Sequence, residues 1–166
     1  MRLRLKWSRV RRPEWIAGAG GVVLLAAMLL MPWYTLLLVT PPPGPRYFST
    51  HSVDGWHGLT HARWLALITV LVALAVVFSQ ARERAPALPI ALAVIAVPLA
   101  VATFVWLLIR FLIAPPGGRD IGGWIGLLGT AAIAYGGYRS LRLEGIDPAD
   151  APAEIPTIRL RGEGAT

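Results

Sequence analysis

The chain of 166 residues contains no cysteine and a single lysine, Lys6, and only 15% of its residues are charged. The absence of cysteine excludes disulfide bonds, thiolate zinc sites and cysteine nucleophiles. Soluble domains carry about 25% charged residues. The low charge, together with 55% hydrophobic residues and a mean hydropathy of +0.58, therefore excludes an ordinary soluble domain. Disorder is excluded as well, because it requires low hydrophobicity. The composition predicts a small, single-domain integral membrane protein.

Four stretches carry no charged side chain, namely residues 15–45, 64–81, 85–109 and 121–138. A helix of roughly 20 apolar residues crosses the hydrocarbon core of a bilayer. Continuous apolar runs favour helices over the alternating pattern of a membrane β-barrel. We therefore expect an all-α fold, an integral membrane four-helix bundle over residues 15–143. The expected helices cover residues 15–39, 61–80, 87–113 and 121–140, with an outer loop at 40–60.

Basic residues are distributed unevenly between the two sides of this topology. Twelve fall on one side: Arg2, Arg4, Lys6, Arg9, Arg11, Arg12, Arg82, Arg84, Arg139, Arg142, Arg159 and Arg161. Four fall on or near the other: Arg46, Arg63, Arg110 and Arg119. The positive-inside rule then predicts that both termini are cytoplasmic, with a basic N-terminal segment at 1–14 and a flexible tail at 144–166. The expected location is the bacterial plasma membrane, crossed several times.

The net charge of +7 has a simple explanation in this topology. Cytoplasmic basic residues are attracted to anionic lipid headgroups, so the lipid bilayer is the expected partner of the basic segments and no nucleic acid is expected. Tryptophans mark the predicted interfaces between membrane and water. They are Trp15, Trp33, Trp64, Trp106 and Trp124.

The predicted spans contain no buried Asp, Glu or His, and proton-coupled carriers usually have such groups inside the membrane. This argues against a pump or a secondary transporter. The last span instead carries small residues at four-residue spacing, on one face of the helix, where another backbone can approach closely. They are Gly122, Gly126, Thr130 and Ala134. The pattern favours packing within the chain and leaves a second chain as an alternative.

The outer loop holds all three histidines. If the second helix begins near Asp54, then Asp54, His57 and His61 share one face and His51 can reach them from the loop. Imidazoles and a carboxylate suit zinc or another transition metal. The alternatives are an ordinary polar loop, which the glycines at 55 and 58 favour, and a pH-sensing loop.

Arg110 and Asp120 form a second candidate pair near the outer interface. Arg110 either extends its charged group to the headgroups or pairs with Asp120 or Asp54. Asp120 can also cap the last helix at its positive end.

Several short motifs resemble those of small four-span actinobacterial membrane proteins of unknown function. They are Met31-Pro32-Trp33-Tyr34, Ser52-Val53-Asp54-Gly55-Trp56, Arg110 before Pro115-Pro116-Gly117, Gly123-Trp124-Ile125-Gly126 and Arg139-Ser140-Leu141-Arg142. Those proteins often have Ser-Ala-Trp where this chain has Asp54-Gly55-Trp56. The resemblance covers residues 15–143 and implies the topology and the bacterial source. It implies no activity.

The sequence shows no nucleophile–base pair, so we expect no enzyme, no catalytic residue and no cofactor. The expected function is that of an accessory or scaffolding protein that binds a membrane protein partner through helix faces or the outer loop. The alternatives are an oligomeric channel or small-solute transporter, or a metal- or pH-sensing outer loop.

Overall fold

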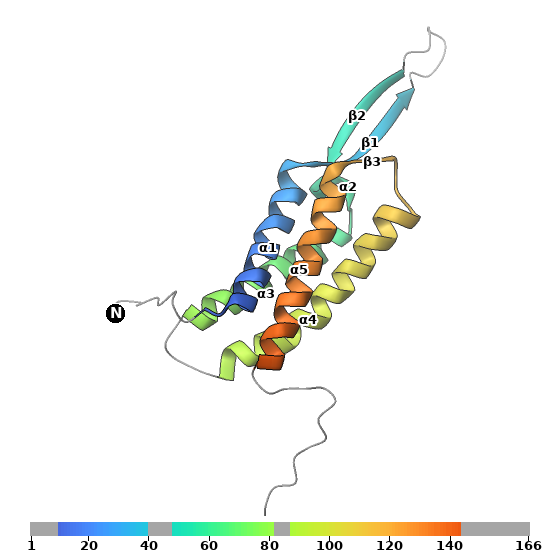
Figure 1. The fold of residues 1–166 in the computed structure, drawn as a ribbon. Helices are drawn as coiled ribbons and strands as arrows, with labels where there is room; N and C mark the ends of the chain where they lie inside the picture. Colours follow the sequence, from blue (N-terminus) through green and yellow to red (C-terminus); the bar gives the residue numbers. More distant parts are fainter. Residues whose placement is uncertain (1–9, 40–47, 82–86, 144–166) are drawn as a thin grey trace, which may run out of the picture.

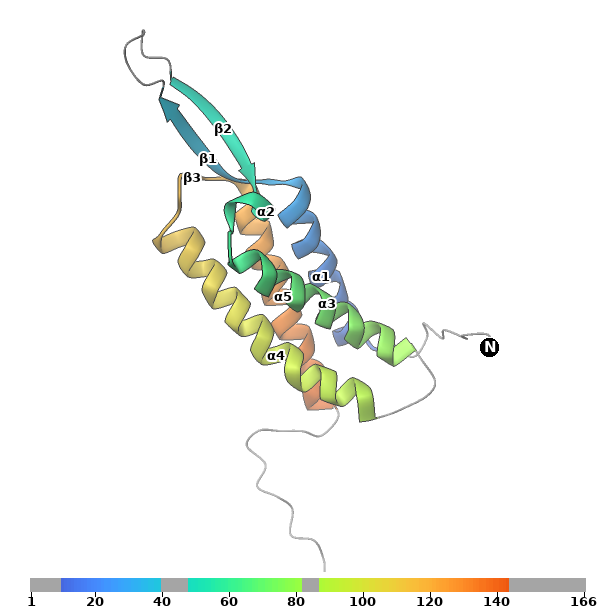
Figure 2. The ribbon, with the colours of Figure 1, turned by 180° about the vertical axis from the view of Figure 1, so that it is seen from behind.

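The structure is a computed structural model that describes residues 10–39, 48–81 and 87–143. Four long helices run side by side, and a narrow β-hairpin extends beyond one end of them (Figures 1 and 2). The elements in chain order are α1 (Arg12–Leu30), β1 (Pro32–Val39), β2 (Phe48–Asp54), α2 (Gly55–Gly58), α3 (Ala62–Ala81), α4 (Ala87–Leu108), the π-helix η2 (Ile109–Ile113), β3 (Gly118–Arg119) and α5 (Ile121–Leu143). Most of the expected basic segment, and the whole expected tail at 144–166, lie outside the described residues.

The fold is mostly helical, as predicted, but the expectation of an all-α protein is wrong. A small antiparallel sheet has the strand order β2-β1-β3. In the hairpin, Tyr34 lies opposite Val53 and Leu36 opposite His51, while β3 pairs only with Tyr34 and Thr35. The expected outer loop at 40–60 therefore contains a strand and the one-turn helix α2.

The predicted first helix, 15–39, is wrong in its last third, because α1 ends at Leu30. Pro32 lacks an N–H and pushes the preceding residue out of the helical region. Met31 accordingly has φ −113° and ψ 145°, which is extended backbone. The charge-free run continues through β1, so the absence of charge alone did not show where the helix stops.

The other helices match their predicted positions closely. The range 61–80 corresponds to α3, 121–140 corresponds to α5, and 87–113 corresponds to α4 together with η2. The π-helical turn widens the end of this third long helix and carries Phe111 into the core. Irregular turns of this kind are uncommon and cannot be predicted from an apolar run.

Three helical segments are long and apolar enough to cross a membrane: α1, α3 and the segment Leu92–Ile113. Of the described helices, α5 is the longest but is not among them. Its many glycines lower the average hydropathy of the helix without making it polar.

The four long helices form a ring in which each contacts two others. α1 and α4 each pack against both α5 and α3. The closest approach joins α1 and α5, where glycines let the backbones touch. A Cβ atom added to Gly20 would lie 2.7 Å from the carbonyl oxygen of Gly129, and one added to Gly136 would lie 2.5 Å from that of Pro13. This contact sets the first and last helices against each other over their length.

Candidate functional site

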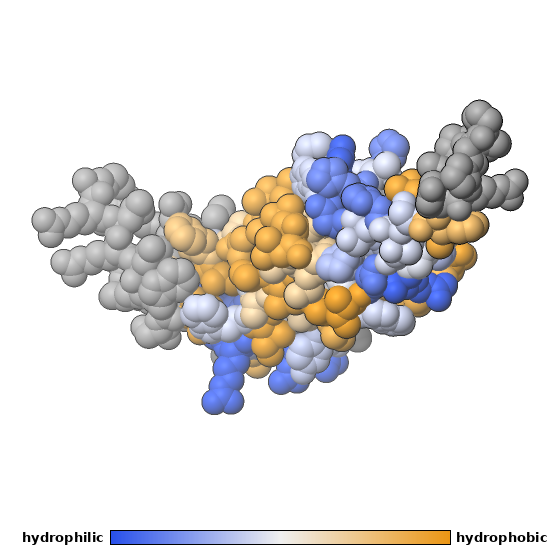
Figure 3. Space-filling model, turned by 90° about the horizontal axis from the view of Figure 1, so that it is seen from above, coloured by the Kyte–Doolittle hydropathy of each residue, from blue (hydrophilic) through white to orange (hydrophobic). Residues whose placement is uncertain are grey.

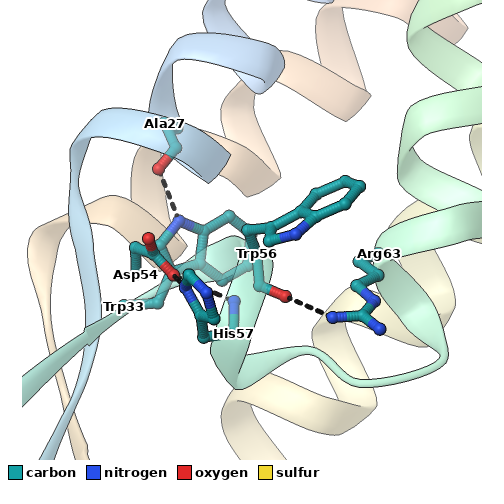
Figure 4. A network of polar contacts seen from close by, with 6 residues as sticks. All are labelled: Ala27, Trp33, Asp54, Trp56, His57 and Arg63. Carbon is teal, nitrogen blue, oxygen red and sulfur yellow. Dashed lines mark hydrogen bonds and ion pairs between the residues drawn. The ribbon is translucent and has the colours of Figure 1, made fainter.

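The hairpin is joined to the bundle by two fully buried aromatic residues, Trp33 and Tyr34. The indole Nε1–H of Trp33 donates a hydrogen bond of 2.8 Å to the carbonyl oxygen of Ala27, in the last turn of α1 (Figure 4). Its ring meets Phe111 edge-on, with the ring centroids 6.4 Å apart. The prediction that Trp33 lies in an interfacial belt is therefore wrong. A tryptophan can be buried without cost to its polar N–H when that N–H donates a hydrogen bond to an unpaired carbonyl at a helix end.

The phenol of Tyr34 lies against η2. Its hydroxyl is 3.5 Å from the carbonyl oxygen of Arg110. Burial raises the pKa of Tyr34 above its usual value, and the nearby positive charge of Arg110 acts in the opposite direction. The neutral phenol is therefore the form that this packing favours.

Asp120 holds β1 to the start of α5. The Oγ1 of Thr35 donates a hydrogen bond to the Asp120 carboxylate, and the backbone N–H of Asp120 donates to the carbonyl oxygen of Trp33 at 3.0 Å. The sequence predicted this carboxylate to be a helix cap or a partner of Arg110. The structure shows instead a side-chain bond from Asp120 to the base of the hairpin.

Asp54 ends the hairpin and begins the short helix α2. Its Oδ1 accepts the backbone N–H of His57 at 2.9 Å and lies 2.7 Å from the Nδ1 of the same residue (Figure 4). Gly55 is required next, because a Cβ there would lie 2.7 Å from the ring of Trp33. A Cβ atom added to Gly58 would likewise lie 2.7 Å from the ring of Tyr34. The turn that follows β2 is thus built around the two buried aromatic residues.

Arg63 closes this end of the bundle. Its guanidinium carbon lies 5.3 Å from the ring centroid of Trp56 and 5.5 Å from that of Trp64, which is the geometry of a cation–π contact. One guanidinium nitrogen also donates to the carbonyl oxygen of Trp56, at 3.4 Å. Arg63, α2 and the top of α3 therefore form one packed unit beneath the hairpin.

Beyond this anchor the hairpin extends away from the helices (Figures 1 and 2). Leu37, Leu38 and Phe48 are 64%, 54% and 69% exposed. Successive residues of a strand face opposite sides, so Leu37 and Leu38 place apolar surface on both faces of the hairpin. Seen from above, the described surface shows hydrophobic residues beside hydrophilic ones (Figure 3). Among the described strands, β3 covers only the base of β1, and β2 has no neighbour on its outer edge.

The four predicted metal ligands do not come together. Asp54 and His57 pair, whereas His51 lies within β2 opposite Leu36 and His61 lies at the exposed start of α3. Within the described residues, no three His, Asp or Glu side chains are grouped so that they could hold a metal ion. The short helix α2 ends too soon to stack His61 over Asp54 and His57, which the predicted site required.

Arg110 lies half-buried in η2, and its Nη1 donates to the carbonyl oxygen of Ala114 at 2.8 Å. Between the described residues, no ion pair joins it to Asp120 or Asp54. A neighbouring arginine, Arg119, donates to the carbonyl oxygens of Phe111 and Leu112, at 3.0 and 2.8 Å. Both arginines thus satisfy carbonyl groups that η2 leaves free at its end.

The predicted small face of α5 is partly the one that packs. Gly122 and Gly126 lie against Trp33, and Gly129 and Gly136 continue that line against α1. Thr130 is buried and donates back to its own helix, whereas Ala134 is only partly buried. The partners are other elements of the same chain, which is the alternative that sequence analysis favoured.

One buried charged residue was missed by the sequence analysis. Because α1 begins at Arg12, Glu14 lies inside the first turn, and it is only 1% exposed. Its carboxylate accepts the backbone N–H of Arg11 at 2.8 Å and the hydroxyl of Ser140 at 3.4 Å. Pro13 followed by Glu14 is a usual start of a helix, so the sequence did contain the signal for an earlier beginning.

No family model, curated protein or solved structure matches this chain.

Proposed function

We propose that this chain is a non-enzymatic integral protein of the bacterial plasma membrane that binds a protein partner on the outer side through its β-hairpin. The observation that carries the proposal is the hairpin itself: two strands that leave the bundle with exposed apolar side chains and open strand edges. The proposal combines a membrane bundle, an orientation and a docking element, and each has its own support.

The membrane placement is supported by the surface of the helices. Three segments have the length and apolar composition of membrane spans. Large apolar side chains are exposed on all four long helices, for example Val22 (56%), Leu71 (58%), Ile95 (55%) and Leu128 (69%). Such side chains would be in contact with water in a soluble protein. We therefore propose that α5, protected from water by the same lipid, is the fourth span.

The orientation is supported by the distribution of charge along the bundle. The start of α1 and the end of α5 lie at the end opposite the hairpin (Figure 1). Among the described residues, that end carries Arg11, Arg12, Arg139 and Arg142, while the hairpin end carries Arg63, Arg110 and Arg119. The larger excess predicted for the first end comes from basic residues of the segments 1–9 and 82–86 in the sequence. The positive-inside rule then assigns it to the cytoplasm and the hairpin to the outer side.

The hairpin has the properties of a docking element. An isolated two-stranded hairpin is only marginally stable in water, and open strand edges readily pair with another chain. Recognition by strand addition uses such an edge for affinity and alternate side chains for specificity. Trp33, Tyr34 and Asp120 hold the base of the hairpin rigidly, so an incoming strand meets a preorganised edge.

The test is a photocrosslinking experiment in cells of the native host. A photoreactive residue at position 37 or 48 should give one adduct of defined mass with a second protein, whereas the same residue at position 138, at the other end of the bundle, should not. Purified, that partner should bind the Leu37→Ser/Phe48→Ser variant at least about tenfold more weakly than the parent.

The matched control is Thr50→Ser, an exposed polar position in the strand of Phe48 and opposite Leu37. It should bind the partner as the parent does. Adducts of twice the chain mass alone would overturn the proposal in favour of a homo-oligomer. Equal crosslinking at positions 37 and 138 would overturn it as well, because the contact would then not be specific to the hairpin.

A further inference from the structure

A groove lies at the end of the bundle opposite the hairpin, between the start of α1 and the end of α5. It has a volume of about 310 Å³. Six residues line it: Arg12, Pro13 and Ile16 from α1, and Tyr135, Arg139 and Leu143 from α5. We propose that this groove binds the headgroup of an anionic phospholipid, with Arg12 and Arg139 on its phosphate. The inference rests on the membrane placement argued above.

The groove follows from the close contact of the two helices. Gly136 packs against the backbone of Pro13 and Ala17, so the helix axes come close together at this end. The longer side chains beside that contact form the two walls of the groove. Because α1 and α5 run in opposite directions, the first turn of one and the last turns of the other supply its walls.

The chemistry of the lining combines two cations with an apolar floor. Arg12 and Arg139 are exposed, and their planar guanidinium groups suit bidentate contact with a phosphate. The hydroxyl of Tyr135 adds a donor, and this side chain is 55% exposed. Ile16 and Leu143 supply apolar surface, which the first carbons of an acyl chain can cover. A free phosphate would use the cations and leave this apolar surface exposed.

Among the described residues, the acidic side chain near the groove is Glu14, and it does not oppose the anion directly. Glu14 does not line the groove. It is buried in the contact between the helices, where Arg11 and Ser140 donate to its carboxylate. The groove itself therefore presents two positive charges and no negative one among the described residues.

The position of the groove also suits a lipid headgroup. Arg12 is the first residue of α1, which is one of the three segments apolar enough to span. Basic pockets between membrane helices on the cytoplasmic side are established binding sites for anionic headgroups. Arg139 lies in the last two turns of α5, so both arginines belong to helix ends that the proposed orientation places toward the cytoplasmic surface.

The experiment measures lipid binding to the purified full-length chain by native mass spectrometry in a mild detergent. The probes are phosphatidylglycerol and phosphatidylcholine with identical acyl chains, and inorganic phosphate as a competitor. The parent should retain one phosphatidylglycerol at least about tenfold more tightly than phosphatidylcholine. The Arg12→Gln/Arg139→Gln variant should lose this preference.

The matched control is Arg11→Gln/Arg142→Gln, which removes two charges from the same helix ends without touching the groove. This control should retain the preference for phosphatidylglycerol. Equal loss in both variants, or equal binding of the two lipids by the parent, would overturn the proposal. Displacement of the lipid by inorganic phosphate at similar concentration would also overturn it, because the site would then recognise a soluble anion.

Two further measurements keep the result interpretable. Circular dichroism establishes that each variant is folded, and Arg139→Gln alone replaces the double variant if the latter is not. Alkaline extraction of membranes tests whether the chain is integral. A chain released by alkali would contradict both this proposal and the proposed function, whereas loss of the lipid preference alone leaves the hairpin proposal intact.

Discussion

Trp33 joins the hairpin to the bundle through both its ring and its single polar atom. Its ring fills the space above Gly122 and Gly126, and its Nε1–H satisfies Ala27 at the end of α1. Truncating a buried tryptophan to alanine typically costs about 3–5 kcal/mol. The direction of the hairpin therefore depends on one side chain that fits only because its neighbours on α5 lack a Cβ atom.

We expect Gly126→Leu to destabilise the fold by about 3 kcal/mol or more, since overpacking a filled core costs roughly 1–3 kcal/mol and sometimes more. A Cβ at this position would already lie 2.5 Å from Cζ2 of Trp33. The ring cannot move aside, because Ala27, Gly55 and Gly122 hold it on the other sides. Chemical unfolding in detergent measures the loss.

The control for this variant is Gly118→Ala, where an added Cβ would lie 3.5 Å from Thr35, an ordinary contact. It should unfold as the parent does. The loss in Gly126→Leu should not depend on protein concentration, because the contact is within one chain. A stable variant that merely fails to oligomerise would show that this face packs against a second copy.

Tyr34 makes the stability of the chain depend on pH in the alkaline range. Because burial raises the pKa of Tyr34 in the folded state above the usual phenol value of 10.0, the phenol ionises more readily once the chain is unfolded. Its contribution to stability is therefore complete below pH 10 and is lost as the pH rises through the folded-state pKa. Unfolding free energies measured across this range should fall, and Tyr34→Phe should flatten that fall.

The control is Tyr135→Phe, which removes a phenol hydroxyl from an exposed position away from Tyr34. The difference between the two variants isolates the contribution of Tyr34. An identical pH profile for Tyr34→Phe and the parent would assign the loss to other groups.

At the scale of elements, α5 packs along two lines of small residues. Gly122, Gly126, Gly129 and Gly136 face Trp33 and α1, whereas Gly123 and Gly137 face Phe111 and Val97 of the third long helix. Sequence spacing identified the first two glycines, because residues four apart share a helical face. It then continued to Thr130 and Ala134, whereas the packed glycines follow one another at steps of four, three and seven residues. The positions that must be small are determined by the residues of α1 and β1 that pack against α5.

The hairpin shows the limit of an argument from charge-free runs. The charge-free run continues from α1 into β1, so it predicted one long helix. Pro32 and the aromatic pair that follows it are typical of a helix end and a strand. The pairing partner, however, lies beyond residues 40–47, and strand pairing depends on contacts between residues far apart in the sequence.

At the scale of the whole molecule, the two ends of the bundle differ in chemistry. One carries the hairpin, held by aromatic residues and by Asp54 and Asp120. The other carries arginines on both α1 and α5, beside the groove. This polarity connects the two proposals, because a partner on the outer side and an anionic lipid on the inner side require the same orientation.

The orientation can be tested by cysteine labelling, because the chain has no cysteine of its own. In intact cells, a membrane-impermeant maleimide should label Thr50→Cys, in the hairpin, and should not label Arg142→Cys until the membrane is opened. Labelling of both positions in intact cells would show that an even number of helices cross the membrane between them, which contradicts the proposed set of four spans. Labelling of Arg142→Cys alone would show that the orientation is opposite to the one proposed.

The sequence alone indicated an apolar, mostly helical chain, the number of its long helices and, to within three residues, the limits of all of them except α1. Those properties follow from composition and from local hydropathy, which each segment carries alone. The tertiary structure decided where α1 stops, that β1 pairs with β2, that Trp33 is buried, and which of the candidate ligands approach one another. It also placed Arg12 beside Arg139. These features depend on which surfaces meet, and residues distant in the sequence meet only when the whole chain has packed.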